Sequence, residues 1–355
     1  MKTHLFHLFF GLFILCVACR SGHKQNRIDN GRIPLLVFTD FGRDVDDAEA
    51  FTYIAKNDSF NLAGVVCCGY IPECRAKSLN LFLHSLGTEV PIAVGAALPL
   101  EVTDSTLITK YLVDHSLDGK PYEYTLFENL AETIDTSRFL TNIDADYLVD
   151  SLLNCYKGRL RIVVLSQATD VAHYFNQYPD RTSDVHSIYI QGQAVVDSIN
   201  KRLSPDEAAY NLKEDLEAAR ILLSLQDSAP LIFLGKYAAY PMAYSTEEFR
   251  RMSQNNGKAG EYLYQAAVKG LECFAQRDSS TFYRVFNLAP FVPLSKAVEE
   301  SGKLSNPYDL LTVIAIDKPE LFNSHKVGKH TLIGVRKEDN PIAGFQKLKK
   351  LILGL

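Results

Sequence analysis

The sequence predicts an α/β fold with a mostly parallel central sheet and helices on both of its faces. Short apolar runs without polar alternation occupy residues 33–38, 62–68 and 159–165, which is typical of strands that are covered on both sides. Segment 73–86, between two of these runs, has apolar residues at helical spacing. Because strand and helix patterns alternate at short intervals, the chain predicts βαβ units and a parallel sheet.

Size and charge narrow the class of protein. The chain has 355 residues, of which 47% are hydrophobic and 22% charged, as is ordinary for a globular protein with a sizeable core. The net charge is −5 and no long basic run is present, so no nucleic-acid partner is predicted. A small-molecule partner is favoured. Region 104–141 is polar and aromatic with weak periodicity, which predicts loops near a site.

The first apolar run leads into a loop with four aspartates within eight residues. Asp40 follows the run directly, and Asp44, Asp46 and Asp47 come next. Gly42 permits a tight turn between them. Apolar residues recur at helical spacing from residue 46 onward, so this stretch predicts a strand, an acidic loop and a helix.

Four carboxylates this close repel one another, and a bound cation is the simplest compensation. Oxygen donors alone favour a hard ion such as Ca²⁺ over Zn²⁺, which prefers Cys and His. In open α/β sheets, ligands also bind at the carboxyl ends of strands. The simpler interpretation is that Asp46 and Asp47 complement a helix N-terminus while Asp40 and Asp44 are solvated. Two aspartates would favour that interpretation, whereas four favour the metal.

The stretch 39–48, Thr-Asp-Phe-Gly-Arg-Asp-Val-Asp-Asp-Ala, resembles the signature of the inosine-uridine-preferring nucleoside hydrolase family. In that family an aspartate-rich loop after the first strand holds Ca²⁺ and ribose. Asp40 precedes Asp47 by seven positions here, which is a longer spacing than in the commonest members. The resemblance implies a nucleoside-hydrolase-like version of the α/β fold.

Three later segments resemble the same family in the same order. Residues 166–172 resemble a turn in which a threonine carbonyl completes the metal shell, and Thr169 takes that position. Residues 208–219 resemble a segment whose asparagine contacts ribose, here Asn211, although Ala209 replaces a glutamate. Residues 304–322 resemble the segment that supplies the last metal ligand, Asp309, with Tyr308 where many members carry histidine. The family also carries an asparagine after the second strand; in this sequence Gly69 and Tyr70 occupy the approximate position.

The resemblance implies a set of roles at one site. Asp40 would be catalytic base and metal ligand, with Tyr308 contacting the leaving base. The other implied roles are Ca²⁺ binding by Asp47, Asp309 and the carbonyl of Thr169, and sugar binding by Asp46, Asp44 and Asn211. His115, in a loop, is a candidate substitute acid, although simple solvent exposure would equally account for it.

These roles predict a hydrolase that cleaves the N-glycosidic bond of ribonucleosides, releasing base and ribose for salvage. Asp40 would activate a Ca²⁺-bound water, because cleavage passes through an oxocarbenium-like sugar that needs carboxylates and an activated nucleophile. Two alternatives stay open. One is an inactive nucleoside- or sugar-binding protein, and the other is a hydrolase for another glycoside. A homo-oligomer is also compatible with the sequence.

The N-terminus resembles a bacterial export signal. Residues 1–19 have a basic start, a short apolar region and the ending Val-Ala-Cys, which resembles a lipobox whose Cys19 is lipidated. Residues 20–32 would be a polar tether and residues 33–355 the folded domain. This predicts a protein of the bacterial cell envelope that touches the membrane only through a lipid anchor at Cys19; ordinary secretion is the alternative.

Overall fold

The computed structural model describes a defined part of the chain. The predicted signal segment with Cys19, nearly all of the predicted tether, and His115 lie outside the described residues. In this part of the chain, no helix has the length and apolar character needed to cross a membrane. The described residues are 31–42, 44–114, 116–117, 120–121, 143–285, 288, 292–293, 296, 305–335 and 344–354.

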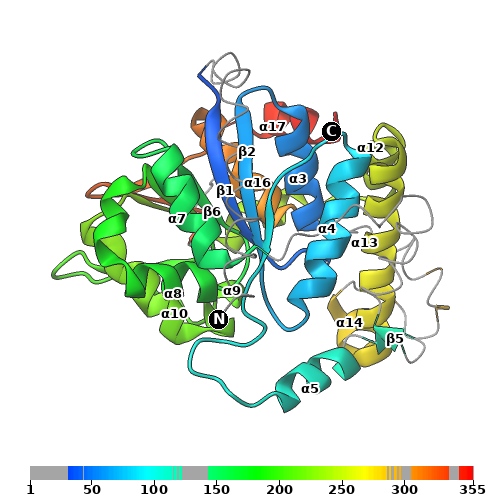
Figure 1. Cartoon of the computed structure of the whole chain (residues 1–355). Coiled ribbons are helices and arrows are strands. Elements are labelled where there is room, and N and C mark those ends of the chain that lie inside the picture. The colour runs from blue at the N-terminus through cyan, green and yellow to red at the C-terminus, as the bar shows by residue number, and fades with distance from the viewer. Residues whose placement is uncertain are drawn as a thin grey trace.

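A sheet forms the centre of the molecule (Figure 1). It has eight strands in the order β11-β12-β10-β7-β6-β1-β2-β3. Neighbouring strands are parallel except β11 and β12, which are antiparallel. The mostly parallel sheet predicted from the sequence is therefore confirmed. Its strands are β1 (Ile33–Thr39), β2 (Phe60–Cys67), β3 (Ile92–Val94), β6 (Arg161–Val164), β7 (Ser187–Gln191), β10 (Leu231–Leu234), β11 (His325–Val327) and β12 (His330–Ile333).

The strand β1 is buried on both faces, which explains its unbroken apolar run. Leu35 and Val37 belong to one core cluster, whereas Leu36 and Phe38 belong to another on the opposite face of the sheet. Alternate side chains of a strand point to opposite faces, so each layer of helices receives every second residue. Two apolar layers thus replace the polar alternation expected of a half-exposed strand.

Helices cover both faces of the sheet, as the sequence predicts (Figure 1). The cluster on one face includes residues from α3 (Asp46–Lys56), α4 (Pro72–Ser85) and α16 (Tyr308–Asp317). The opposite cluster includes residues from α7 (Ala145–Cys155), α8 (Thr169–Gln177) and α10 (Leu216–Ser224). Helix α16 packs against α3, and this contact brings a late segment of the chain beside the first loop.

Shorter elements and outer helices complete the described structure. Helix α5 lies in region 104–141, where the sequence predicts loops; its apolar residues between Leu107 and Leu112 recur at helical spacing, although only Tyr111 is fully buried. The other elements are α5 (Thr106–Asp114), β4 (Ser116–Leu117), β5 (Lys120–Pro121), η2 (Pro179–Asp184), β8 (Ala194–Val196), β9 (Leu203–Pro205), α9 (Tyr210–Glu214), η3 (Leu225–Asp227), α11 (Lys236–Ala239), η4 (Tyr240–Met242), α12 (Thr246–Gln254), α13 (Gly257–Arg277), α14 (Ser279–Val285), η5 (Pro319–Leu321) and α17 (Phe345–Leu353).

Asp170 connects the end of β3 to the first turn of α8. The backbone N–H of Ala96 donates to its Oδ1 at 2.9 Å. A Cβ at Gly95 would stand 2.6 Å from its Oδ2, so the glycine makes room for the carboxyl group. Burial raises the pKa of Asp170 to about 6. Its proton is therefore held more tightly in the native state than in the unfolded chain.

We expect Asp170→Asn to change how stability depends on pH. The stabilising contribution of the Asp170 proton is complete below about pH 4 and is lost as pH rises to about 6, a difference of roughly 1–3 kcal/mol. The asparagine variant does not titrate, so its unfolding free energy relative to the natural protein should rise over this window. Urea denaturation at the two pH values measures the change. The exposed control Asp180→Asn should show no such trend, and a pH-independent difference for Asp170→Asn would contradict the expectation.

Candidate functional site

A pocket of about 390 Å³ opens at the carboxyl edge of the sheet. It lies across the ends of β1, β6 and β7 and the first residues of α9, α11 and α16. Ligands of open α/β sheets bind at this edge. The lining residues are Asp40, Asp44, Asp46, Leu165, Gln191, Gly192, Gln193, Ala208, Ala209, Tyr210, Asn211, Lys236, Tyr240, Tyr308 and Asp309.

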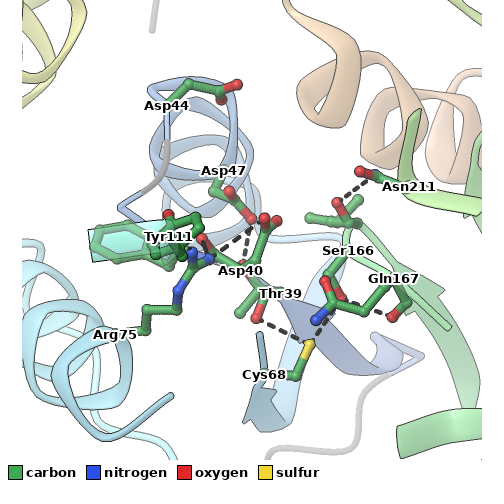
Figure 2. A network of polar contacts seen from close by, with 12 residues as sticks. Thr39, Asp40, Asp44, Asp47, Cys68, Arg75, Tyr111, Ser166, Gln167 and Asn211 are labelled. Carbon is green, nitrogen blue, oxygen red and sulfur yellow. Dashed lines mark hydrogen bonds and ion pairs between the residues drawn. The ribbon is translucent and has the colours of Figure 1, made fainter. Parts of the chain in front are cut away.

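The acidic loop after β1 forms one end of the pocket. Gly42 takes a φ of +92°, a left-handed conformation that favours glycine, and this turn returns the chain to α3. Asp46 and Asp47 occupy the first turn of α3, where the helix dipole favours negative charge. Carboxylate oxygens of Asp44, Asp46 and Asp47 lie within 4.8 Å of one another. Asp40 and Asp47 come from opposite ends of the loop and meet beside Thr39 (Figure 2).

Asp47 lies behind the pocket wall and does not line the pocket. It is buried and accepts a hydrogen bond from the Thr39 hydroxyl. Asp309, in the first turn of α16, is also buried and lies close enough to Asp47 for the two carboxyl groups to interact. The structure thus brings Asp309 to the acidic loop, although it lies 269 positions after Asp40 (309 − 40).

This arrangement buries more negative charge than nearby groups neutralise. Burial raises the pKa of Asp46, Asp47 and Asp309 well above the usual range of a carboxyl group. Neighbouring carboxylates raise these pKa values further, with Asp309 acting on Asp46, Asp40 on Asp47, and Asp47 on Asp309. A cation would favour the ionised forms of all three groups.

The guanidinium of Arg75 supplies part of the missing positive charge. Arg75, on α4, is 2% exposed, and its Nη1 lies 3.3 Å from Asp40 Oδ2. The same group donates to the backbone carbonyl of Asp40, and Nη2 donates to the Tyr111 hydroxyl at 2.8 Å. Figure 2 shows Arg75 between Asp40 and Tyr111. Sequence reasoning missed Arg75; the available signal was an arginine placed directly between the small residues Cys74 and Ala76 of the helix.

Asn211 and Thr169 stand at the same edge in different settings. Asn211 lines the pocket, and its Nδ2 donates to the Leu165 carbonyl and to Gln191 Oε1, both at 2.8 Å. These two acceptors fix the orientation of its amide. Thr169 is buried at the start of α8 and its hydroxyl donates to Asp215 Oδ2 at 2.8 Å. Thr169 does not line the pocket, but it follows β6, which pairs with β1.

Aromatic side chains line the pocket next to the acids. Tyr308 precedes Asp309 on α16, and its ring lies 6.4 Å from that of Tyr240 at 74°. Burial, followed by the influence of Tyr240 and Asp46, raises the pKa of the Tyr308 hydroxyl. Tyr240 and Lys236, which follow β10, were also missed from the sequence, because no pattern indicates that this strand ends beside β7.

The donor set fits a hard divalent cation. Asp44, Asp46 and Asp47 offer carboxylate oxygens close enough to bind one ion, with Asp40 and Asp309 beside them. Ca²⁺ and Mg²⁺ take oxygen ligands of this kind. The surplus of buried negative charge is the observation that supports a metal here.

Comparison with known proteins gives one family. Residues 35–342 match the family model described as inosine-uridine preferring nucleoside hydrolase. The match extends over both Asp40 and Asp309. No curated protein matches the chain by sequence at a significant level.

Solved structures share the fold at low identity. The type III effector protein XopQ, crystallised with adenosine diphosphate ribose, aligns with a TM-score of 0.74 and 22% identity, covering 92% of this chain and 93% of that chain. The purine-preferring ribonucleoside hydrolase from Gardnerella vaginalis aligns with a TM-score of 0.62 and 16% identity, covering 90% and 97%. A plant nucleoside hydrolase aligns with a TM-score of 0.59 and 18% identity, covering 91% and 99%.

We expect Arg75→Met to make stability depend on Ca²⁺. Removing one partner of a buried ion pair should lower the unfolding free energy by about 3–5 kcal/mol without metal, because the acids lose their nearest cation. Added Ca²⁺ should then raise the melting temperature of the variant more than that of the natural protein. Thermal denaturation with chelator and with Ca²⁺ measures both effects.

Two further variants control this experiment. Arg75→Lys keeps the charge and should show a smaller dependence on Ca²⁺. Arg202→Met breaks an exposed pair with Asp227 and should cost about 0–1 kcal/mol with no Ca²⁺ dependence. An equal response to Ca²⁺ in Arg75→Met and the natural protein would show that Arg75 does not balance the acidic cluster.

Proposed function

Because the chain belongs to the inosine-uridine preferring nucleoside hydrolase family, we propose that it cleaves the N-glycosidic bond of ribonucleosides to release base and ribose. The observation that supports this most is the meeting of Asp40 with Asp47 and Asp309 at one pocket edge. Glycosidic cleavage develops positive charge on the sugar, which nearby carboxylates stabilise. The acidic end of the pocket offers this environment.

In this proposal Asp40 takes the proton of the attacking water. It follows β1 directly and lines the pocket, and Arg75 holds its carboxylate in place. Asp46 or Asp44 accepts hydrogen bonds from ribose hydroxyls, and Asn211 holds the sugar from the other wall. A Ca²⁺ ion held by Asp40, Asp47, Asp309 and the carbonyl of Thr169 would lower the pKa of a water and orient two sugar hydroxyls.

In this proposal Tyr308 contacts the base rather than the sugar. It lines the pocket beside Tyr240, and the two rings form an aromatic wall next to the acids. Since the pKa of its hydroxyl is raised, Tyr308 keeps its proton near neutrality and is a poor general acid. We assign it to packing against the leaving base.

A second candidate is a nucleoside- or sugar-binding protein without turnover. The ion pair between Arg75 and Asp40 favours it, because it engages one oxygen of the proposed base. Ala209, which lines the pocket where the family carries a glutamate, removes one hydroxyl contact. A hydrolase for another glycoside is a variant of the first proposal and would use the same acids.

The site of action is proposed from the N-terminal signal alone. Residues 1–19 and Cys19 favour export and lipid anchoring at the bacterial cell envelope, or secretion if Cys19 is not lipidated. In that place the enzyme would supply bases and ribose for salvage from nucleosides outside the cytoplasm. Assembly into homo-oligomers also stays a proposal.

We expect the purified chain with Ca²⁺ to release free base from at least one ribonucleoside of a full panel. Asp40→Asn should lower kcat by about 10²–10⁴-fold, because an amide cannot accept the water proton. Chelation of Ca²⁺ should stop release in the natural protein, and re-addition should restore it. Chromatography of the released base gives the rate.

The exposed control Asp180→Asn should keep full activity. Calorimetry separates the two candidates. Nucleoside binding without base release from any substrate would favour the binding protein over the hydrolase.

A further inference from the structure

Departure of the base requires a group that the acidic end of the pocket lacks. The electron pair of the broken bond passes to the base, and a proton or a cation must stabilise it there. The aspartates are assigned above to the attacking water, the metal and the ribose hydroxyls, which leaves the departing base to another group. The Tyr308 ring packs beside that of Tyr240, with 6.4 Å between their centres, and is assigned above to contact with the face of the base.

Lys236 is the one cationic side chain among the lining residues of this pocket. It is the first residue of α11, directly after β10 and Gly235. Its Nζ lies 5.6 Å from the centre of the Tyr237 ring. Among the residues that the structure describes, it makes no hydrogen bond or ion pair with an acid, so its ammonium group is available to a ligand.

Lys236 and Asp40 occupy opposite ends of the pocket. Strands β6 and β7 separate β1, which leads to Asp40, from β10, which leads to Lys236. Three strand spacings of about 4.8 Å place these two strand ends roughly 14 Å apart. A sugar held at the acids would therefore direct its base toward the lysine.

Aromatic rings connect the two ends. The ring of Tyr237 contacts that of Tyr240 at 5.7 Å, and Tyr240 contacts Tyr308 at 6.4 Å. Tyr308 precedes Asp309, and Tyr237 lies under the ammonium of Lys236. Aromatic faces of this kind accept a flat apolar group and tolerate a nearby cation. The pocket between acids and lysine is thus suited to a flat heterocycle.

We propose that Lys236 is the catalytic residue that protonates the departing base. This inference rests on the hydrolase function proposed above. The water oxygen bonds to the anomeric carbon and a water proton passes to Asp40. The carbon–nitrogen bond breaks with its electron pair on the base, which takes a proton from the Lys236 ammonium. Solvent then restores the proton of Lys236, and Asp40 loses its proton to solvent.

The test compares two leaving groups in Lys236→Met. Cleavage of inosine should lose about 100-fold in kcat, because the base no longer receives a proton. Cleavage of 4-nitrophenyl riboside should change less than about threefold, since its phenolate leaves without protonation. Lys236→Arg should recover part of the inosine activity, because a guanidinium still donates a hydrogen bond. The exposed control Lys347→Met should leave both rates unchanged.

Two outcomes of this comparison would overturn the proposal. Equal losses for inosine and 4-nitrophenyl riboside would mean that Lys236 supports the pocket as a whole. A preference for inosine 5′-monophosphate over inosine that disappears in Lys236→Met would mean that the lysine binds a phosphate group instead.

Binding keeps the inference testable if the natural protein cleaves neither substrate. Calorimetry with inosine and with ribose then reports the contact alone. Lys236→Met should weaken inosine binding at least about tenfold, which corresponds to a loss of about 1.4 kcal/mol in binding free energy. Ribose binding should stay unchanged. If the variant binds both ligands equally more weakly, or binds neither more weakly, the placement of the base at Lys236 is overturned. Absence of turnover in the natural protein counts only against the proposed hydrolase function.

Discussion

Repulsion among buried carboxylates governs the organisation of this protein. Asp46, Asp47 and Asp309 are buried close to one another. Burial raises the pKa of each carboxyl group, and the charges of neighbouring carboxylates raise it further. Such a cluster destabilises the fold unless positive charge is brought to it. Arg75 provides one fixed charge from within the chain, and an oxygen-binding metal is suited to provide the remainder. The acidic end of the pocket is therefore a place where stability and chemistry depend on the same balance of charge.

The parallel sheet makes this concentration of charge possible. The parallel strands β1, β6, β7 and β10 end at one edge, so loops from distant parts of the sequence meet there. The contact of α16 with α3 then adds Asp309 from the far end of the chain. Because the strands are covered on both faces, the edge is held rigidly by two apolar layers. Packing in this core fixes where the strands end, and therefore where the side chains at the edge stand.

The sequence predicts the parts of this structure that depend on local pattern. The apolar run of β1 and the acidic loop after it are readable directly, and the order of motifs leads to Asp309. Arg75 and Lys236 were not predictable in this way, because their importance depends on what packs against them. An arginine on a helix is ordinarily exposed, and only the fold places this one against Asp40. Helix α5 was missed although its apolar residues recur at helical spacing, because the helix is short and lies in a largely polar and aromatic region.

The division of the pocket between separate loops bears on how the protein changes over evolution. The acids stand on the β1–α3 connection and on α16, whereas Lys236 and Tyr240 stand on the segment after β10. A change at Lys236 alters the proposed heterocycle end, and among the described residues Lys236 makes no hydrogen bond or ion pair with the carboxylates; a change at Tyr240 also removes its contact with Tyr308, next to Asp309. Under the proposed assignment, base preference would therefore change most directly at Lys236, whereas an exchange among the buried acids alters the charge balance to which Arg75 contributes.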